Sequence, residues 1–393
     1  MRKRAESLAI LQSLRSVLTE PAVLHAPSFE GNEWLYVKEC LDTGWVSSAG
    51  SYVERFEAML AKYTGARRAV AVVNGTAALH ICMLLAGVKK NDEVLIPSLT
   101  FVATANAVSY CGALPHFIEC AEESLGVDPA KLESHLQRIA EVRADGTYNR
   151  TTGRRIGAVV PMHTFGHPVD LDTLAEVCRR FQLELLEDAA ESLGSCYKGR
   201  HTGTFGRASA LSFNGNKVIT TGGGGAILTN DDEFADAAKH LTTTAKLPHR
   251  WEFVHDLIGY NYRMPNINAA LGCAQLEQLP GFIEQKRSLA GLYRTAFEGA
   301  AGVRFFSEAP YARSNYWLNA LILEESRVDL RDEILELTNQ EGIMTRPVWT
   351  PLHLLPIYSG CPRMELPVTE SLGRRVINIP SSPGLGKGGS PCP

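Results

Sequence analysis

The sequence predicts an α/β protein, with a large unit built on a mostly parallel sheet flanked by helices and a smaller C-terminal α+β unit. Between about residues 67 and 229, short apolar segments of strand length alternate with segments of helical apolar spacing, which is typical of a sheet covered by helices on both faces. The 393 residues exceed what one minimal core needs. The apolar share of 45% and the charged share of 21% are those of a globular chain.

The large unit is expected to contain seven strands joined by helices. The strands cover residues 69–73, 93–97, 114–118, 156–161, 183–187, 208–213 and 225–228. The helices between them cover residues 75–86, 101–109, 131–138 and 171–181. The polar, glycine-containing stretch 141–155 interrupts this alternation, so we expect an excursion from the sheet such as a hairpin.

The second half of the chain is expected to begin with helices that bridge to the smaller unit. Spacing predicts helices over 231–243, 269–279 and 282–298, with a break at Pro280 and Gly281, then a strand over 316–323 and a helix over 329–340. The tail is rich in Gly and Pro without periodicity, which favours disorder. We therefore divide the chain into an N-terminal helical segment (1–28), a large unit (29–265), bridging helices with a small C-terminal unit (266–382) and a disordered tail (383–393).

Composition excludes several classes of protein. A net charge of −4 and a pI near 6.3 give no basic footprint for nucleic acid. The N-terminus starts with basic residues but then places Glu6 and Gln12 in an amphipathic pattern, which indicates a surface helix and not a secretion signal. No apolar run approaches the roughly twenty residues that cross a membrane. Nine scattered cysteines lack paired spacings, so we expect free thiols in a reducing cytoplasm, without a metal site.

The first motif with chemical content is NGTAAL at residues 74–79. It follows a strand and opens a helix, where unpaired backbone N–H groups and the helix dipole favour a phosphate group. The alternative is an ordinary strand-to-helix turn in which Thr76 is only a capping residue.

The second motif, LEDAAE at residues 186–191, places Asp188 at the end of a predicted buried strand. Such strand ends are where α/β proteins assemble their ligand sites. Asp188 suits a protonated ring nitrogen, and the small Ala189 and Ala190 would let a flat ring lie close to the backbone. A helix cap or a surface carboxylate is the alternative.

The third motif is SFNGNK at residues 212–217, followed by TTGGGG at 220–225. A lysine at a strand end, beside hydroxyl and amide groups and before four glycines, suits a nucleophile next to a phosphate pocket. The alternatives are a solvated lysine and a glycine hinge. No Gly-Lys-Ser or Gly-Lys-Thr occurs here, so a P-loop NTPase is not indicated. Together, the three motifs provide phosphate donors, an acid for a pyridine nitrogen and an amine for an aldehyde, which are the needs of pyridoxal phosphate (PLP).

The order of the motifs NGTAAL, PSLTFVATANA, LLEDAAES, SFNGNK and GYNYRMPNINAALG resembles the DegT/StrS family of sugar aminotransferases, over about residues 29–382. This family lies within the aspartate aminotransferase-like fold type I of PLP enzymes, so the resemblance implies that fold, PLP as cofactor and a homodimer with shared active sites. One departure is Gly223, because many relatives carry Glu there and no role of that glutamate can be transferred.

The resemblance implies a set of cofactor contacts. Thr76 and the backbone of Ala77 would bind the phosphate with Ser212, Phe101 would stack on the ring, and Asp188 would pair with the ring nitrogen. Lys217 would bind the aldehyde covalently, and Glu191 would lie near the ring hydroxyl, where many members have Gln. The remaining contacts are Gly75, Ala190, Asn214, and Asn261 acting on the cofactor of the neighbouring subunit.

The segments GWVSSAG (44–50) and RPVWTPLH (346–353) are similar to family segments that line the sugar-nucleotide cleft. The substrate-binding residues implied are Trp45, Ser47, Ser48, His163, Arg263, Trp349 and His353. Core positions for the two tryptophans, a structural role for His163 and an ion pair for Arg263 are the alternatives.

The resemblance also implies a reaction. L-Glutamate would donate the amino group to the C4 keto group of a nucleotide-linked 4-keto-6-deoxy sugar. The branch it most resembles uses UDP-2-acetamido-4-keto-2,6-dideoxyhexose, on the way to bacillosamine or legionaminic acid. A sugar dehydratase of the same fold would have histidine in place of Lys217, and a non-catalytic regulatory homologue would have lost Lys217 or Asp188. A fold type I enzyme that acts on amino acids is a third alternative, disfavoured by the two cleft segments.

Overall fold

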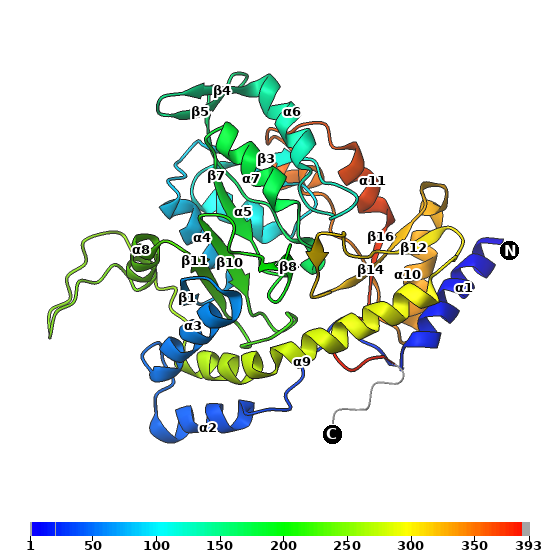
Figure 1. Cartoon of the computed structure of the whole chain (residues 1–393), viewed down its shortest axis with the longest axis horizontal. Helices are drawn as coiled ribbons and strands as arrows, with labels where there is room; N and C mark the ends of the chain where they lie inside the picture. Colours follow the sequence, from blue (N-terminus) through cyan, green and yellow to red (C-terminus); the bar gives the residue numbers. More distant parts are fainter. Residues whose placement is uncertain (1, 20, 387–393) are drawn as a thin grey trace.

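The computed structural model describes residues 2–19 and 21–386, and its centre is a nine-stranded sheet (Figure 1). Among its seven main strands, only β11 runs antiparallel to its neighbours, β1 and β10, whereas the pairs from β10 to β3 are parallel. The mostly parallel sheet predicted from the sequence is therefore confirmed. In spatial order, its seven main strands are β1 (Arg68–Val72), β11 (Gly225–Thr229), β10 (Ala208–Ser212), β7 (Glu184–Asp188), β6 (Arg155–Val159), β2 (Glu93–Pro97) and β3 (Leu114–Ile118).

Helices cover both faces of this sheet because the strand residues alternate between two apolar layers. In β1, Val70 and Val72 pack with the layer of α4, α5 and α8, whereas Ala69 and Ala71 pack with the layer of α3 and α9. A third apolar cluster lies under α6 and α7. These helices are α3 (Ser51–Thr64), α4 (Gly75–Leu85), α5 (Val102–Tyr110), α6 (Pro129–Ile139), α7 (Leu171–Arg180), α8 (Asp232–Thr242) and α9 (Asn266–Ala296).

The polar excursion expected over 141–155 is a hairpin. Its strands are β4 (Ala140–Arg143) and β5 (Gly146–Asn149), and β5 pairs with β6 at the edge of the main sheet. Glu93 at the start of β2 accepts hydrogen bonds from Asn149 and Thr152, so the hairpin is fixed to the sheet by a buried carboxylate.

A second, antiparallel sheet forms in the C-terminal part of the chain. Its order is β12 (Val303–Phe305), β14 (Asn319–Leu323), β16 (Val376–Ile379) and β15 (Arg346–Pro347). The N-terminal helix α1 (Arg2–Val17) packs against α9 and α10 (Arg331–Gln340) beside this sheet, and α11 (Pro367–Arg375) leads into β16. We propose that the boundary between the two units lies at residue 265, just before α9.

The remaining elements are short or peripheral. Helix α2 (Glu33–Thr43) packs on α9, and a small sheet joins β13 (Ala312–Arg313), β8 (Cys196–Tyr197) and β9 (Arg200–His201). The 3₁₀ turns are Thr164–Gly166, Glu325–Leu330, Leu352–Leu354 and Pro356–Tyr358. The eight cysteines in the described part of the chain are free. Among the described residues, none of the helices combines the length and apolar character required to cross a bilayer.

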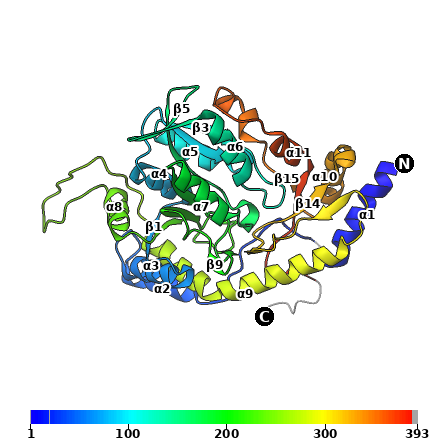
Figure 2. The same cartoon turned by 45° about the horizontal axis from the view of Figure 1, so that its top comes forward.

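Two sequence predictions are corrected by the structure. Helix α9 continues through Pro280, where a break was expected, and it links the two sheets as one element (Figure 2). Buried apolar residues on both sides of the proline, Leu279 and Phe282 among them, hold the helix together although proline removes one backbone hydrogen bond. The predicted disordered tail is also ordered at its start, because Leu385 packs on a core cluster and Gly386 bridges to Leu18. Residues 387–393 lie outside the described residues.

Candidate active site

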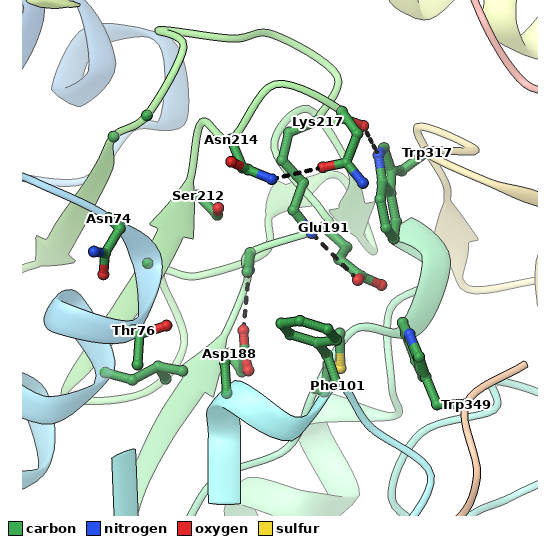
Figure 3. Close-up of a pocket in the computed structure, with 18 residues that line it drawn as sticks. Asn74, Thr76, Phe101, Asp188, Glu191, Ser212, Asn214, Lys217, Trp317 and Trp349 are labelled. Carbon is green, nitrogen blue, oxygen red and sulfur yellow. Dashed lines mark hydrogen bonds and ion pairs between the residues drawn. The ribbon is translucent and has the colours of Figure 1, made fainter. Parts of the chain in front are cut away.

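A cavity of about 370 Å³ opens at the edge of the main sheet where β7 and β10 end and α4 begins (Figure 3). The C-terminal ends of parallel strands are the usual position of ligand sites in such sheets. The three sequence motifs meet here. The lining residues are Asn74, Gly75, Thr76, Leu79, Phe101, Ala103, Met162, Asp188, Ala190, Glu191, Ser212, Asn214, Asn216, Lys217, Gly223, Gly224, Trp317 and Trp349.

One end of the cavity is suited to an anion. Asn74 caps α4 by accepting the Ala77 N–H at 2.8 Å, and the hydroxyl-bearing Thr76 and Ser212 line the space beside this helix N-terminus. A Cβ atom on Gly75 would lie 3.0 Å from the Ser212 Cβ, so glycine lets the first turn of α4 approach the end of β10. Ala77 does not line the cavity, and its N–H serves the cap. This differs from its predicted role in phosphate binding.

Asp188 supplies a buried carboxylate that suits a cation, in contrast to the end of the cavity that suits an anion. Its side chain is almost completely buried, and Oδ2 accepts the Thr104 hydroxyl at 2.7 Å while Oδ1 accepts the Ala190 N–H at 3.2 Å. Burial raises the pKa of this carboxyl, and the two hydrogen bonds oppose that shift. A protonated ring nitrogen placed beside Asp188 would add a third interaction that stabilises its carboxylate form, after the hydrogen bonds from Thr104 and Ala190.

The amine of Lys217 lies between a carboxylate and an aromatic ring. Its Nζ is 3.3 Å from Oε1 of Glu191 and 3.9 Å from the centroid of the Trp317 ring, and its side chain is 13% exposed. The other oxygen of Glu191 accepts the Phe165 N–H at 2.9 Å. Burial raises the pKa of Glu191 to about 7, and the Lys217 charge works against this rise. Figure 3 shows the ion pair facing into the cavity.

Trp317 is fixed by hydrogen bonds to one residue that lines the cavity, Asn216, and to two that do not, Asn315 and Lys286. Its indole N–H donates to the Asn216 carbonyl at 2.7 Å, and its backbone N–H donates to Oδ1 of Asn315 at 2.8 Å. The buried Lys286 of α9 donates to the Trp317 carbonyl at 3.1 Å and also to the Ser381 carbonyl. Burial lowers the pKa of Lys286 well below its ordinary value. The ring that faces the reactive amine is therefore held by a segment that leads into the second sheet.

The aromatic residues predicted at the site form one wall. Phe101, which precedes α5, is half exposed, and its ring centroid lies 6.3 Å from that of Trp349. Both line the cavity, as do Ala190 and Asn214. A flat ring bound between Phe101 and the backbone at Ala190 would be covered on both faces, and the stacking role of Phe101 stays a prediction.

Other predicted substrate residues lie elsewhere. His163 is completely buried, with Nε2 3.0 Å from Oε2 of Glu187 and Nδ1 accepting the Val169 N–H, so it does not reach the cleft. His353 is buried against Ser98 and Glu370. The structure places both as internal hydrogen-bonding residues, because their ring nitrogens already have protein partners.

The remaining predicted residues are at the surface, outside the cavity. Trp45 is 59% exposed and lines a separate hollow with Tyr52 and Asn266. Ser47 is exposed, and Ser48 is partly exposed. Asn261 and Arg263 are exposed on the segment that follows α8, where backbone bridges tie them to Thr243 and Val72.

Sequence reasoning missed eight residues that line the cavity, and one of them, Asn74, is the residue that caps α4. Trp317 and Met162 contribute the largest of these side chains. No sequence signal marks Trp317, since it lies about a hundred residues after Lys217 in an unremarkable segment. The others are Leu79, Ala103, Asn216, Gly223 and Gly224.

Residues 27–389 match the model of the DegT/DnrJ/EryC1/StrS aminotransferase family. The chain belongs to this family. It is 39% identical over 364 residues to a GDP-perosamine synthase of Escherichia coli O157:H7, which covers 92% of this chain and 93% of the relative. A GDP-perosamine synthase of Vibrio cholerae is 37% identical, over 92% of this chain and 94% of the relative. EpsN of Bacillus subtilis, named a putative pyridoxal phosphate-dependent aminotransferase, is 38% identical over 85% of this chain and 83% of its own.

Solved structures share the fold. The aminotransferase TlmJ from Streptoalloteichus hindustanus superposes with a TM-score of 0.83 at 28% identity, covering 94% of this chain and 95% of that one. DesV from S. venezuelae superposes with a TM-score of 0.79 at 30% identity, covering 92% and 90%. The predicted aminotransferase fold is therefore confirmed, and the chain is an aminotransferase.

Pyridoxal phosphate is the cofactor of this aminotransferase, and the cavity fits its chemistry. The helix N-terminus with Thr76 and Ser212 suits the phosphate, the buried Asp188 suits the pyridine nitrogen, and the amine of Lys217 suits the aldehyde. When bound, the cofactor supplies the electron sink for amino-group transfer.

Replacing Thr76 with alanine is expected to weaken pyridoxal phosphate binding about tenfold. A hydrogen bond to a charged group contributes about 1.5–3 kcal/mol, and the rest of the phosphate cradle would remain. The dissociation constant measured by titrating the cofactor-free protein checks this. Ser134→Ala is the matched control, because it removes a hydroxyl group from the exposed face of α6. This variant should bind pyridoxal phosphate with the affinity of the wild type. Equal affinities of the wild type and Thr76→Ala would contradict a phosphate role for this hydroxyl.

Glu191 should make the stability of the cofactor-free protein depend on pH. Its folded-state pKa of about 7 lies above the ordinary 4.5, so the folded protein binds the extra proton and loses stability as pH rises through this window. The loss amounts to about 3 kcal/mol. Glu191→Gln removes this titration. Between pH 5 and pH 8, the melting temperature of the wild type is expected to fall relative to that of Glu191→Gln. A constant difference would contradict the raised pKa.

Proposed function

We propose that this enzyme transfers the amino group of L-glutamate to the C4 keto group of a nucleotide-linked 4-keto-6-deoxy sugar. The observation that carries the proposal is the cavity itself, where the Lys217 amine, the Asp188 carboxylate and an anion-binding helix end face the same space. The presence of both Lys217 and Asp188 also argues against the dehydratase and the non-catalytic homologue.

Each of these residues would have a distinct role. Lys217 would hold the cofactor through its aldehyde and, once displaced, would move a proton between the amino-bearing carbon and the cofactor. Asp188 would keep the pyridine nitrogen protonated, because a buried carboxylate stabilises a neighbouring cation. Phe101 and Trp349 would exclude water from one side of the ring.

The nucleotide of the acceptor sugar is inferred from the relatives of the chain. The sequence favours a UDP-linked 2-acetamido sugar, whereas relatives 37–39% identical over most of the chain are named GDP-perosamine synthase. We therefore propose a GDP-linked sugar as the acceptor. The UDP-linked 2-acetamido sugar remains the alternative to test beside it.

A second copy of the chain is the proposed partner. The segment after α8 extends away from the body of the protein (Figure 1) and exposes large apolar side chains: Trp251 is 69% exposed, Phe253 77% and Ile258 88%. Exposed apolar surface of this extent is typical of an interface. Asn261 follows on the same segment, which supports its proposed role in completing the site of a neighbouring subunit.

The absorbance spectrum of the purified protein tests the first half of the reaction. L-Glutamate should convert the visible band of the cofactor-loaded enzyme into a near-ultraviolet band and release 2-oxoglutarate. The glutamate-treated enzyme is then offered GDP-4-keto-6-deoxymannose and UDP-2-acetamido-4-keto-2,6-dideoxyglucose separately, and the products are identified by mass spectrometry. Return of the visible band with the GDP sugar alone supports the proposal. A response to the UDP sugar alone would assign the alternative, and no response to either would reject both acceptors.

A further inference from the structure

Glu191 is a buried acid placed against the amine of Lys217. Oε1 lies 3.3 Å from Nζ, and the carboxylate is 2% exposed. Among the described residues, the Lys217 amine donates a hydrogen bond to Glu191. The amine also contacts the aromatic face of Trp317, which cannot take up a proton.

The charges around Glu191 are few. Lys217 favours its ionised form, Asp188 disfavours it, and the Phe165 N–H donates to Oε2. Asp188 has its own hydrogen bonds to Thr104 and Ala190. Glu191 therefore depends on the Lys217 charge to remain ionised, and it would be a buried, uncompensated carboxylate whenever the lysine becomes neutral.

The activity requires Lys217 to become neutral. An ammonium group carries no lone pair, so the amine must lose a proton before it attacks an aldehyde or accepts a proton from substrate. We propose that Glu191 is the proton acceptor for Lys217 and retains within the cavity the proton that the amine gives up.

The transfer conserves charge and needs no co-reactant. One proton moves from Nζ to Oε1, which converts an ammonium and a carboxylate into a free amine and a carboxylic acid. An N–H bond breaks, an O–H bond forms, and nothing is oxidised or reduced. Since the pair starts and ends with zero net charge, the step leaves no unpaired charge in the cavity. The pKa of about 7 for Glu191 agrees with a group that exchanges protons near neutral pH.

Proton counting during cofactor capture tests this step, which rests on the role proposed for Lys217. Pyridoxal phosphate is added at pH 8 to cofactor-free protein in two buffers with different ionisation enthalpies, and calorimetry gives the protons released per subunit. Glu191→Gln should release about one proton more than the wild type, because the amide cannot keep it. Glu191→Asp retains a carboxyl group and should restore the wild-type count.

A second readout follows the amine without any cofactor. The pH dependence of Lys217 acylation, measured by mass spectrometry, should shift down by about one pH unit in Glu191→Gln, because an opposite charge that stabilises the ammonium is lost. Glu57→Gln disrupts a remote Lys239–Glu57 pair of 2.6 Å and should change neither readout.

Equal proton counts in the wild type and Glu191→Gln would overturn the proposal, as would an unchanged acylation profile. Neither measurement uses L-glutamate or a sugar. Failure here would therefore leave the proposed amino-group transfer intact, and failure of that transfer would leave these readouts unaffected.

Discussion

Lys217→Ala is expected to abolish amino-group transfer, with a loss of at least about 10³-fold. The variant lacks both the nucleophile for the cofactor aldehyde and the group that moves the proton, and positioned proton transfer alone contributes about 10²–10⁴-fold. The cofactor should still bind through its phosphate and ring. Stopped-flow absorbance with L-glutamate measures the rate, and borohydride reduction followed by peptide mass spectrometry identifies the attached lysine.

Two variants make this result specific. Lys217→Arg keeps a positive charge near Glu191 but cannot form the covalent bond, so it should be as inactive as Lys217→Ala. Lys239→Ala removes a partly exposed lysine that also pairs with a glutamate, and this variant should react normally. Borohydride labelling of another lysine in the wild type would contradict the assignment.

Asp188→Asn is expected to slow the reaction with L-glutamate by about 10²–10³-fold. The amide preserves the size of the side chain but carries no charge, and loss of one partner of a buried ion pair costs about 3–5 kcal/mol. In the amide, the oxygen can still accept the Ala190 N–H and the NH2 group can donate to the Thr104 hydroxyl oxygen, so the change should act on the ring nitrogen and not on the fold. The rate of the spectral change measures this effect.

The matched control for Asp188→Asn changes its neighbour. Thr104→Val removes the supporting hydroxyl and keeps the carboxylate, so it should reduce the rate much less. If Thr104→Val is as slow as Asp188→Asn, the positioning of Asp188 and not its charge is the property that matters.

The strand and helix positions of the large unit could be predicted because they depend on local pattern. The apolar runs at residues 69–73 and 93–97 correspond to β1 and β2. The break expected at Pro280 did not form, since the burial of Leu279 and Phe282 outweighs the missing hydrogen bond. This balance depends on packing between segments that are distant in the sequence, and a local sequence pattern carries no information about such packing.

The same distinction applies to the site. Thr76, Asp188 and Lys217 stand at strand-to-helix or strand-to-loop junctions, so topology alone brings them together. Trp317 reaches the cavity from beside the second sheet, and only the assembled fold shows this. His163 was misplaced because its motif adjoins the site, while its ring is turned inward to Glu187.

Trp317 has a practical consequence for protein engineering. The ring beside the Lys217 amine is held at its backbone by Asn315 and Lys286, neither of which lines the cavity. A mutagenesis library confined to the residues that line the cavity would therefore omit Asn315 and Lys286, which position the ring that the Lys217 amine contacts. Selections for new acceptor sugars should include the middle of α9 and the segment before β14, because residues there hold Trp317, whose ring lines the cavity beside the Lys217 amine.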